Sequence, residues 1–419
     1  MSRIKQVYLI ALLVITTTSM VSVSRASTTS IPGPLAGGNT ASGVISNIAH
    51  QEKLLLNSIH SQRAISLAIN SLDFQTKIAS THYYFNSIYY EFSWLPNSAN
   101  PVVTMNTVNV VYSHENSNGT TTNIVATEDS SLASVRKVTV ESVVPRNGCV
   151  ISGGHCQASS NWDGYEFFNH VGTTYNPIYQ VRASWTVPQA YVPILSTSGK
   201  NCNWPTHCDL STWVGLSNTA GGGCANGGCI VQGGTESGQQ CGVSGCGPNN
   251  GGYYYPWYEF LPAASVACGG TGGSNIHYGD SYTEYIYNDY QTLHYHIIGY
   301  DLTAGYSCEG QADYNNFACP NNQGFSCIYY GQFISETPLF GTTVATLPAF
   351  TQITTGSTCY IDDNSFYGAY ASCYGASTLG GHWDVNEYHM PCPGYQDMIS
   401  HTAPSSGSNT YSTQYNNSC

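Results

Sequence analysis

Two polar residues at strand positions are the first candidates for chemistry in this chain of 419 residues. Glu336 lies near the end of the stretch 329–338, where alternation predicts one strand that Pro338 stops. Gln232 lies in a short apolar run, 229–234, that ends in two glycines. A carboxyl group can exchange a proton with a bound water, and a carboxamide can donate to an oxyanion without titrating in acid. We therefore expect Glu336 and Gln232 to meet on the surface of one sheet.

Each of these residues has a simpler interpretation when taken alone. A carboxylate at a strand end is usually a solvent-facing acid, and a glutamine before two glycines is usually a polar residue at a turn. His294 and His296 have a spacing that suits metal binding from one strand face, but the pattern favours two solvent-facing histidines. The chain also lacks the His-Glu-x-x-His zinc motif and the Gly-x-Ser-x-Gly elbow. We predict no metal and no cofactor.

The composition indicates an unusual surface. Charged residues make up 8% of the chain, against about 25% in an average soluble domain. From residue 147 onward the only basic residues are Arg182 and Lys200, against 17 acidic residues. A chain with so few cations cannot bind nucleic acid through its phosphates. Self-repulsion among the carboxylates should fall in acid, so we expect an acidic environment.

All 16 cysteines lie at or after Cys149. An even number in an exported chain predicts disulfides, and no Cys-x-x-Cys pair supports zinc instead. Their pairing cannot be deduced from the sequence. The abrupt start of the cysteines coincides with the change in charge, so we place a domain boundary at 148/149.

The first residues, 1–26, have the pattern of a secretory signal peptide. Arg3 and Lys5 precede an apolar run over 7–23, and small residues end the segment at 24–26. An N-terminal membrane anchor is the alternative, but the run is shorter and more hydroxylated than a spanning helix needs. We expect a secreted protein with no membrane attachment after the signal is removed.

Residues 27–148 are predicted to be a mixed α/β pro-segment. Apolar residues recur at near-helical spacing over about 47–72, which predicts one long helix, and strand-like runs follow over 104–112 and 135–144. The alternative is an ordinary N-terminal domain that stays attached. Residues 149–419 have many short alternating runs separated by Gly, Asn and Ser clusters, which predicts an all-β sandwich or barrel.

Six short motifs in this C-terminal part resemble, in order, those of the glutamic peptidases, or eqolisins. They are Asn161–Gly164, Ala183–Pro188, Ser211–Gly215, Cys229–Gly234, Trp257–Pro262 and Phe333–Pro338. The resemblance implies an antiparallel β-sandwich of two curved sheets, similar to concanavalin and other lectins, with a cleft on the concave face. It also implies a secreted, acid-active endopeptidase made as a precursor. Its partners would be polypeptide substrates and its own pro-segment, and we expect a monomer.

The resemblance also implies roles for particular residues. Glu336 would be the general base that activates a water, and Gln232 would hold that water and donate to the oxyanion. The base must be ionised, so hydrogen-bond donors should lower its pKa for work in acid. The cleft would be lined by Trp213, Trp257, Glu259 and Glu236; for Trp213 a place in the core, and for Glu236 a place on the surface, are the alternatives.

The sequence departs from the family at several positions. Gln332 replaces a second Glu that often begins the Glu336 strand, and Ser217 follows the Trp-Val-Gly strand where an acid is usual. A secreted, lectin-like carbohydrate-binding sandwich or a structural envelope protein would have a similar composition. The peptidase hypothesis differs in requiring Glu336 and Gln232 to reach one shared water.

Overall fold

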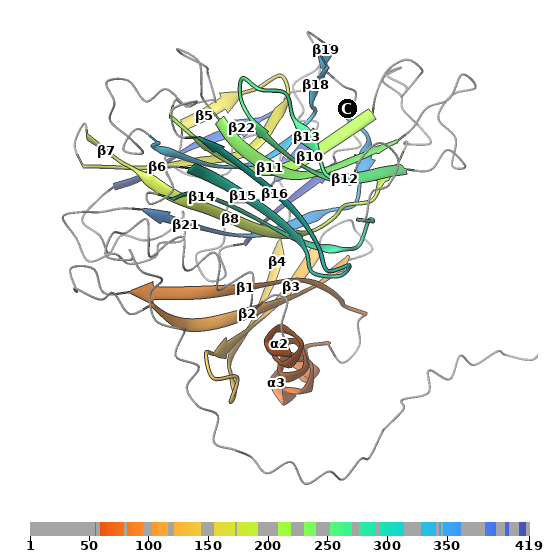
Figure 1. Cartoon of the computed structure of the whole chain (residues 1–419). Helices are drawn as coiled ribbons and strands as arrows, with labels where there is room; N and C mark the ends of the chain where they lie inside the picture. Colours follow the sequence, from red (N-terminus) through yellow and green to blue (C-terminus); the bar gives the residue numbers. More distant parts are fainter. Residues whose placement is uncertain are drawn as a thin grey trace, which may run out of the picture.

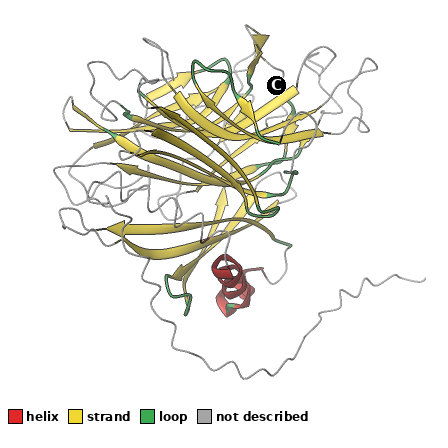
Figure 2. Cartoon of the chain, in the orientation of Figure 1, coloured by secondary structure: helices red, strands yellow, loops and turns green. Residues whose placement is uncertain are grey.

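In the computed structural model of the protein, most of the described elements are strands (Figure 2). The described residues are 55, 59–78, 82–94, 103–115, 121–143, 155–171, 174–191, 208–218, 230–239, 252–269, 276–289, 294–313, 328–340, 343–344, 347–361, 382–390, 399–401 and 410–415. The predicted signal peptide lies outside these ranges. Within them, no helix is both long enough and apolar enough to cross a membrane.

The N-terminal part combines two helices with a four-stranded antiparallel sheet, here called the N-terminal sheet, in the order β1-β2-β3-β4. The elements are α2 (Ile59–Asn70), α3 (Leu72–Ile78), β1 (Tyr84–Trp94), β2 (Val103–Glu115), β3 (Thr121–Asp129) and β4 (Val135–Val143).

The helical segment is divided, whereas the sequence predicted one long helix over about 47–72. The described part forms α2 and α3, with the break at Ser71. Ser71 Oγ accepts a hydrogen bond from the backbone nitrogen of Phe74 at 3.1 Å. Serine is a favoured N-cap residue, so α3 begins as a separate helix. Residues 47–54 lie outside the described ranges.

From His155 onward the described residues form two larger sheets. The outer sheet has the order β13-β12-β11-β10-β17-β6-β22-β5, with β7 beside β6. Its strands are β5 (His155–Ala158), β6 (Trp162–Val171), β7 (Thr174–Asn176), β10 (Cys208–Ser217), β11 (Ile230–Gln239), β12 (Gly252–Phe260), β13 (Val266–Ala267), β17 (Tyr330–Glu336) and β22 (His382–His389). Neighbouring strands run antiparallel, except that β5 is parallel to β22.

The second sheet, here called the middle sheet, has the order β16-β15-β14-β8-β21-β24-β23. Its strands are β8 (Ile178–Thr186), β14 (Ser281–Asp289), β15 (His294–Asp301), β16 (Tyr306–Asp313), β21 (Ile353–Ile361), β23 (Ile399–His401) and β24 (Thr410–Tyr415). Two short pairs complete the fold: β9 (Ala190–Tyr191) with β20 (Ala349–Phe350), and β18 (Leu339–Phe340) with β19 (Thr343–Val344). The predicted all-β antiparallel sandwich is confirmed.

The three sheets are stacked, with the middle sheet between the other two (Figure 1). Strand β8 contacts both β1 and β10, because successive side chains along it point to opposite faces of the middle sheet. Trp185 Nε1 donates to Thr235 Oγ1 of the outer sheet at 3.0 Å. Arg182 Nη2 donates to the Tyr90 carbonyl oxygen of the N-terminal sheet at 2.8 Å. The apolar residues on one face of this stretch are buried, namely Val181, Ala183, Trp185 and Val187, and so are the polar residues on the other face, Gln180, Arg182 and Ser184.

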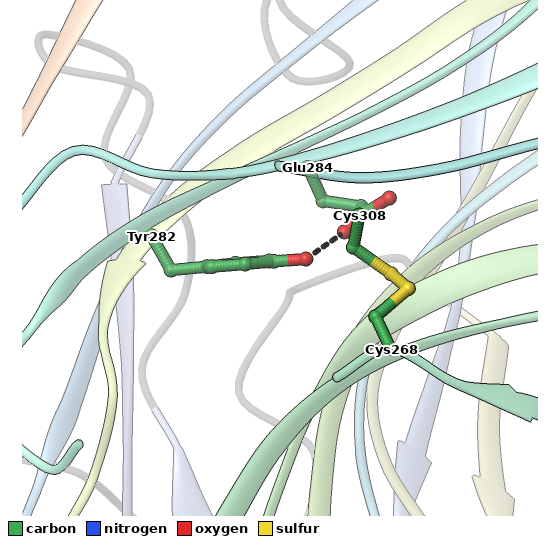
Figure 3. The surroundings of a disulfide bond; sticks show 4 residues. All are labelled: Cys268, Tyr282, Glu284 and Cys308. Atoms are coloured by element: carbon green, nitrogen blue, oxygen red, sulfur yellow. Dashed lines mark hydrogen bonds between the residues drawn. A yellow bond between two sulfur atoms is a disulfide. The ribbon is translucent and has the colours of Figure 1, made fainter. Parts of the chain in front are cut away.

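A disulfide joins the two sheets of the sandwich along one edge. Cys268, just after β13, is bonded to Cys308 in β16, with 5.7 Å between their Cα atoms (Figure 3). Beside it, the Tyr282 hydroxyl donates to Glu284 Oε2 at 2.8 Å (Figure 3). Cys156 and Cys208 are also disulfide-bonded, and no described cysteine is free. Disulfides therefore form here, as the cysteine pattern predicted.

Several carboxyl groups are buried without a cation, and their titration should govern stability. Burial raises the pKa of Glu128 to about 8, of Asp209 to about 7 and of Asp301 to about 6. The unfolded values are about 4. The stability from these neutral carboxyls is thus complete below about pH 4 and is lost as pH rises through 6 to 8.

We therefore expect the melting temperature of the full chain to fall between pH 4 and pH 8, as measured by differential scanning calorimetry. Glu128→Gln, which cannot ionise, should flatten the fall near pH 8. A melting temperature that rises over this range would contradict the assignment.

Candidate active site

The outer sheet carries a cleft of about 640 Å³ on the face turned away from the middle sheet. Strands β10, β11, β12 and β17 build its floor, and their register sets its geometry. Of the six predicted site residues, five line the cleft: Gln232, Glu236, Trp257, Glu259 and Glu336. Trp213 is not among the lining residues. The prediction from alternation that Glu336 shares a face with Ile334, opposite to Phe333, agrees with their separate apolar clusters.

Glu336 is held by donors on both carboxyl oxygens. Asn161 Nδ2 donates to its Oε1 at 2.7 Å, and Trp213 Nε1 donates to its Oε2 at 2.7 Å. Trp162 lies directly opposite Glu336 on β6 and packs edge-to-face on Trp213, with ring centroids 5.2 Å apart. The carboxyl group is therefore fixed in place at the end of β17 before any substrate arrives.

Burial raises the pKa of Glu336 to about 7. Hydrogen bonds from Trp213, Trp162 and Asn161 act in the opposite direction, and the charge of Glu259 adds a smaller rise. The expectation that donors would bring this pKa below its usual range is wrong, because desolvation outweighs them. Below pH 7 the carboxyl group carries its proton.

Gln232 lies two strands away, between Gly215 of β10 and Glu259 of β12. Its Nε2 donates to Glu259 Oε2 at 2.6 Å. Burial raises the pKa of Glu259, and the bond from Gln232 lowers it. The Oε1 atom of Gln232 is buried and accepts no hydrogen bond from the described residues. An amide held on one side with an unused acceptor is suited to binding a water or a substrate N–H.

Glu336 and Gln232 lie on the same face but in different rows of the register. Glu336 is opposite Ser211, whereas Gln232 is opposite Gly215. Four residues of a strand span about 13 Å, so the two backbones are well separated. Glu259, one strand beyond Gln232 on β12, interacts with both residues: it accepts a hydrogen bond from Gln232, and its charge raises the pKa of Glu336. The structure brings the pair into one cleft, without a direct hydrogen bond between them.

Two tryptophans occupy the row between them. Trp213 and Trp257 form an apolar cluster with Ile334 and Tyr388 on the cleft face of the sheet. Trp257 lines the cleft, as predicted. Trp213 is almost fully buried, and its indole nitrogen donates a hydrogen bond to Glu336. The alternative of a core tryptophan therefore describes Trp213 better than a place on the cleft wall.

The glycines after Gln232 are required by close packing. A Cβ at Gly234 would overlap the Thr212 carbonyl and press on Trp213. A Cβ at Gly233 would lie 2.8 Å from Glu284 Oε1, which reaches across from the middle sheet. Any side chain at these positions would force β11 away from its neighbours.

The comparison with protein families covers the same residues. A family model described as the Peptidase A4 family matches residues 160–363, a range that contains Gln232 and Glu336. The sandwich of this chain belongs to the Peptidase A4 family. This confirms the predicted relationship to the glutamic peptidases and implies a peptidase acting on polypeptides. No curated protein and no solved structure matches the chain.

Sequence reasoning missed several side chains in this A4 peptidase cleft. Asn161 was recognised as part of a motif but not as a partner of Glu336, from which it is separated by 175 residues. Glu236 was predicted to line the cleft, but its hydrogen bond with Ser211 was not: it is buried and accepts from the Ser211 hydroxyl, so the alternative of a surface acid is wrong. The spacing of Glu236 four residues after Gln232 was the available signal, since it places both on one strand face.

The structure explains why Gln332 is found where the family often has Glu. Gln332 Nε2 donates to Glu166 Oε2 at 2.6 Å, and Glu166 also accepts from Asn386 at 2.6 Å and Tyr388 at 3.2 Å. Gln332, Glu166 and Asn386 are buried side by side in one row. This A4 peptidase therefore has its carboxylate on β6 and the neutral amide on β17.

A glutamate at position 332 would place two carboxyl groups in contact without a cation. Gln332→Glu should leave the fold intact in acid, where one proton can be shared. It should destabilise the protein by several degrees above about pH 5, because both groups would then have to ionise. Thermal unfolding at pH 3.5 and pH 7 checks this, with Glu166→Gln/Gln332→Glu as the matched control that restores one carboxyl and one amide. Equal melting-temperature losses at both pH values would contradict the contact.

Proposed function

We propose that this protein is a secreted, acid-active endopeptidase that cleaves peptide bonds with Glu336, Gln232 and a bound water. The observation that carries the proposal is the fixed Glu336 carboxyl, held by Asn161 and Trp213 in a cleft shared with Gln232 and Glu259. A cleft of this size suits a substrate segment. The many half-buried carboxyls favour hydrolysis over the alternative of lectin-like carbohydrate binding, which needs no group with a raised pKa.

The raised pKa indicates how Glu336 would act. In acid Glu336 begins in its protonated form. It would then act through both carboxyl oxygens, as an acid and a base at once, and not as the simple base expected from the sequence. One oxygen accepts a proton from the attacking water while the other gives its proton to the peptide, whose C–N bond then breaks. The products are a carboxylic acid and an amine, and Glu336 ends as it began.

Gln232 would act as the non-titrating partner in this step. Its Oε1 can accept a hydrogen bond from the water, and the Nε2 proton not given to Glu259 can be donated to the oxyanion. Glu259 would fix the amide orientation through the 2.6 Å bond. Trp257 would provide an apolar wall for the substrate.

We expect Glu336→Gln to lower kcat/KM on an unfolded protein substrate at pH 3–4 by about 10²–10⁴-fold, because the proton-transfer group is lost. Gln232→Ala should cost about 10²–10³-fold through the oxyanion. Glu309→Gln, an exposed residue of the middle sheet, is the matched control and should keep full activity. Activity like that of the wild type in Glu336→Gln would overturn the assignment.

We also propose that residues 27–148 are a pro-segment removed after secretion. The coincident boundaries in cysteine content and charge support this. The described N-terminal residues line no part of the cleft and pack against the middle sheet, on the side away from it (Figure 1). The described part of the segment thus leaves the cleft uncovered, and it would act on folding of the middle sheet, which it contacts.

N-terminal sequencing of the secreted protein after incubation at pH 3–4 tests this. A new N-terminus close to residue 149 is expected. An intact N-terminus in a fully active sample would refute obligatory removal.

A further inference from the structure

Ser211 lies between two carboxyl groups in the floor of the cleft. In the register it is directly opposite Glu336 on one side and directly opposite Glu236 on the other. Opposite residues on one face of a sheet have Cβ atoms about 5 Å apart. All three side chains line the cleft, and Ser211 and Glu236 are almost fully buried. The row therefore reads Glu336, Ser211, Glu236, with a hydroxyl linking two acids.

The Ser211 hydroxyl donates to Glu236 Oε2. A hydroxyl has one proton and two acceptor lone pairs, so giving its proton to Glu236 leaves Ser211 as an acceptor on the opposite side. Glu336 is the neighbour on that side, and in acid it has a proton to donate. The row thus has one formed hydrogen bond, from Ser211 to Glu236, and the Glu336 carboxyl group on the other side of the hydroxyl.

Asp209 is a further buried acid beside this row, without a hydrogen bond to it. It is buried two residues before Ser211 and lies opposite Gly238. A Cβ at Gly238 would overlap Asp209 Oδ1 and meet the Tyr253 hydroxyl. Because Gly238 has no side chain, the Asp209 carboxyl group can occupy the space over β11, next to Glu236. Neither oxygen of Asp209, nor Oε1 of Glu236, accepts a hydrogen bond from the described residues.

No cation among the described residues neutralises this group. The surrounding titratable side chains are Glu336 on β17, Glu259, Tyr253 and Tyr255 on β12, and the two acids themselves. Arg182, the one arginine in the described sandwich, is bonded to Tyr90 on the side of the N-terminal sheet. Two carboxyls buried near each other without a cation do not both ionise readily, so at least one of Asp209 and Glu236 stays protonated in acid. Besides burial, the charge of Asp209 raises the pKa of Glu236, and the charge of Glu336 adds a smaller rise.

We propose that Ser211, Glu236 and Asp209 are positioning residues that keep Glu336 protonated through the acid range. This rests on the proposed peptidase function of Glu336. The Ser211 oxygen accepts a hydrogen bond from the Glu336 carboxyl and so favours its neutral form. The negative charge that the pair of Asp209 and Glu236 carries when one of its protons is lost also opposes ionisation of Glu336.

The test is the pH profile of kcat/KM between pH 2 and pH 8 on a quenched fluorescent peptide. Ser211→Ala should move the alkaline limb about 0.5–1 pH unit toward acid, because one hydrogen bond to the neutral form of Glu336 is lost. Glu236→Gln should move it in the same direction, because it removes the negative charge that opposes ionisation of Glu336. Ser211→Thr keeps the hydroxyl and should restore the wild-type limb.

The alternatives predict different results. A purely structural role of Ser211 would lower activity at every pH without moving the limb, and that result overturns the proposal. If Ser211 were itself the nucleophile, Ser211→Ala would be inactive at all pH values and a fluorophosphonate would label the wild type, which also overturns it. Failure of the peptidase proposal is separate: it would appear as full activity in Glu336→Gln, whatever the Ser211 variants do.

Discussion

The burial of carboxyl groups without cations is the constraint on which the site depends. In the described sandwich Asp209, Glu236 and Glu284 are buried and Glu336 is half-buried, and desolvation is the largest cause of the rise in each of their pKa values. In most proteins such groups would be paired with lysine or arginine. Here the scarcity of basic residues leaves protonation as the way to remove the charge. The fold is thus matched to acid, in which these groups are neutral hydrogen-bond donors as well as acceptors.

The same constraint explains how glycine and amide residues are used around the cleft. Gly233, Gly234 and Gly238 let carboxyl and tryptophan side chains lie flat against the neighbouring backbone. Gln232 and Gln332 each donate to a glutamate, Glu259 and Glu166, and so supply donors that do not titrate. The outer sheet therefore has two carboxyl–amide pairs in one row, on either side of Gly215, and only the pair of Gln232 and Glu259 lines the cleft. In both pairs the uncharged amide is next to Gly215, and the glutamate is one strand farther out.

Much of this could be predicted from local pattern, and the rest depends on pairing between distant strands. Alternation along β8 and β17 divided the residues correctly between the two faces of each strand, although nearly all of them are buried, and six ordered motifs identified the family. The partners of Glu336 could not be deduced, because the register of β17 against β6 and β10 joins segments more than a hundred residues apart. The pKa of Glu336 was predicted in the wrong direction for the same reason: burial depends on everything packed around the group. The helix break at Ser71 was missed although a serine is a common cap.

The parallel pairing of β5 with β22 limits where the chain can be cut. Strand β4 ends at Val143 and β5 begins at His155. The residues that follow β5, Ser159 and Asn161, form part of the cleft wall, and Asn161 holds Glu336. A cut after His155 would remove an edge strand and loosen the donor that orients the reacting carboxyl. If the N-terminal part is removed as proposed, the cut has to fall between Val143 and His155 to leave both β4 and β5 intact.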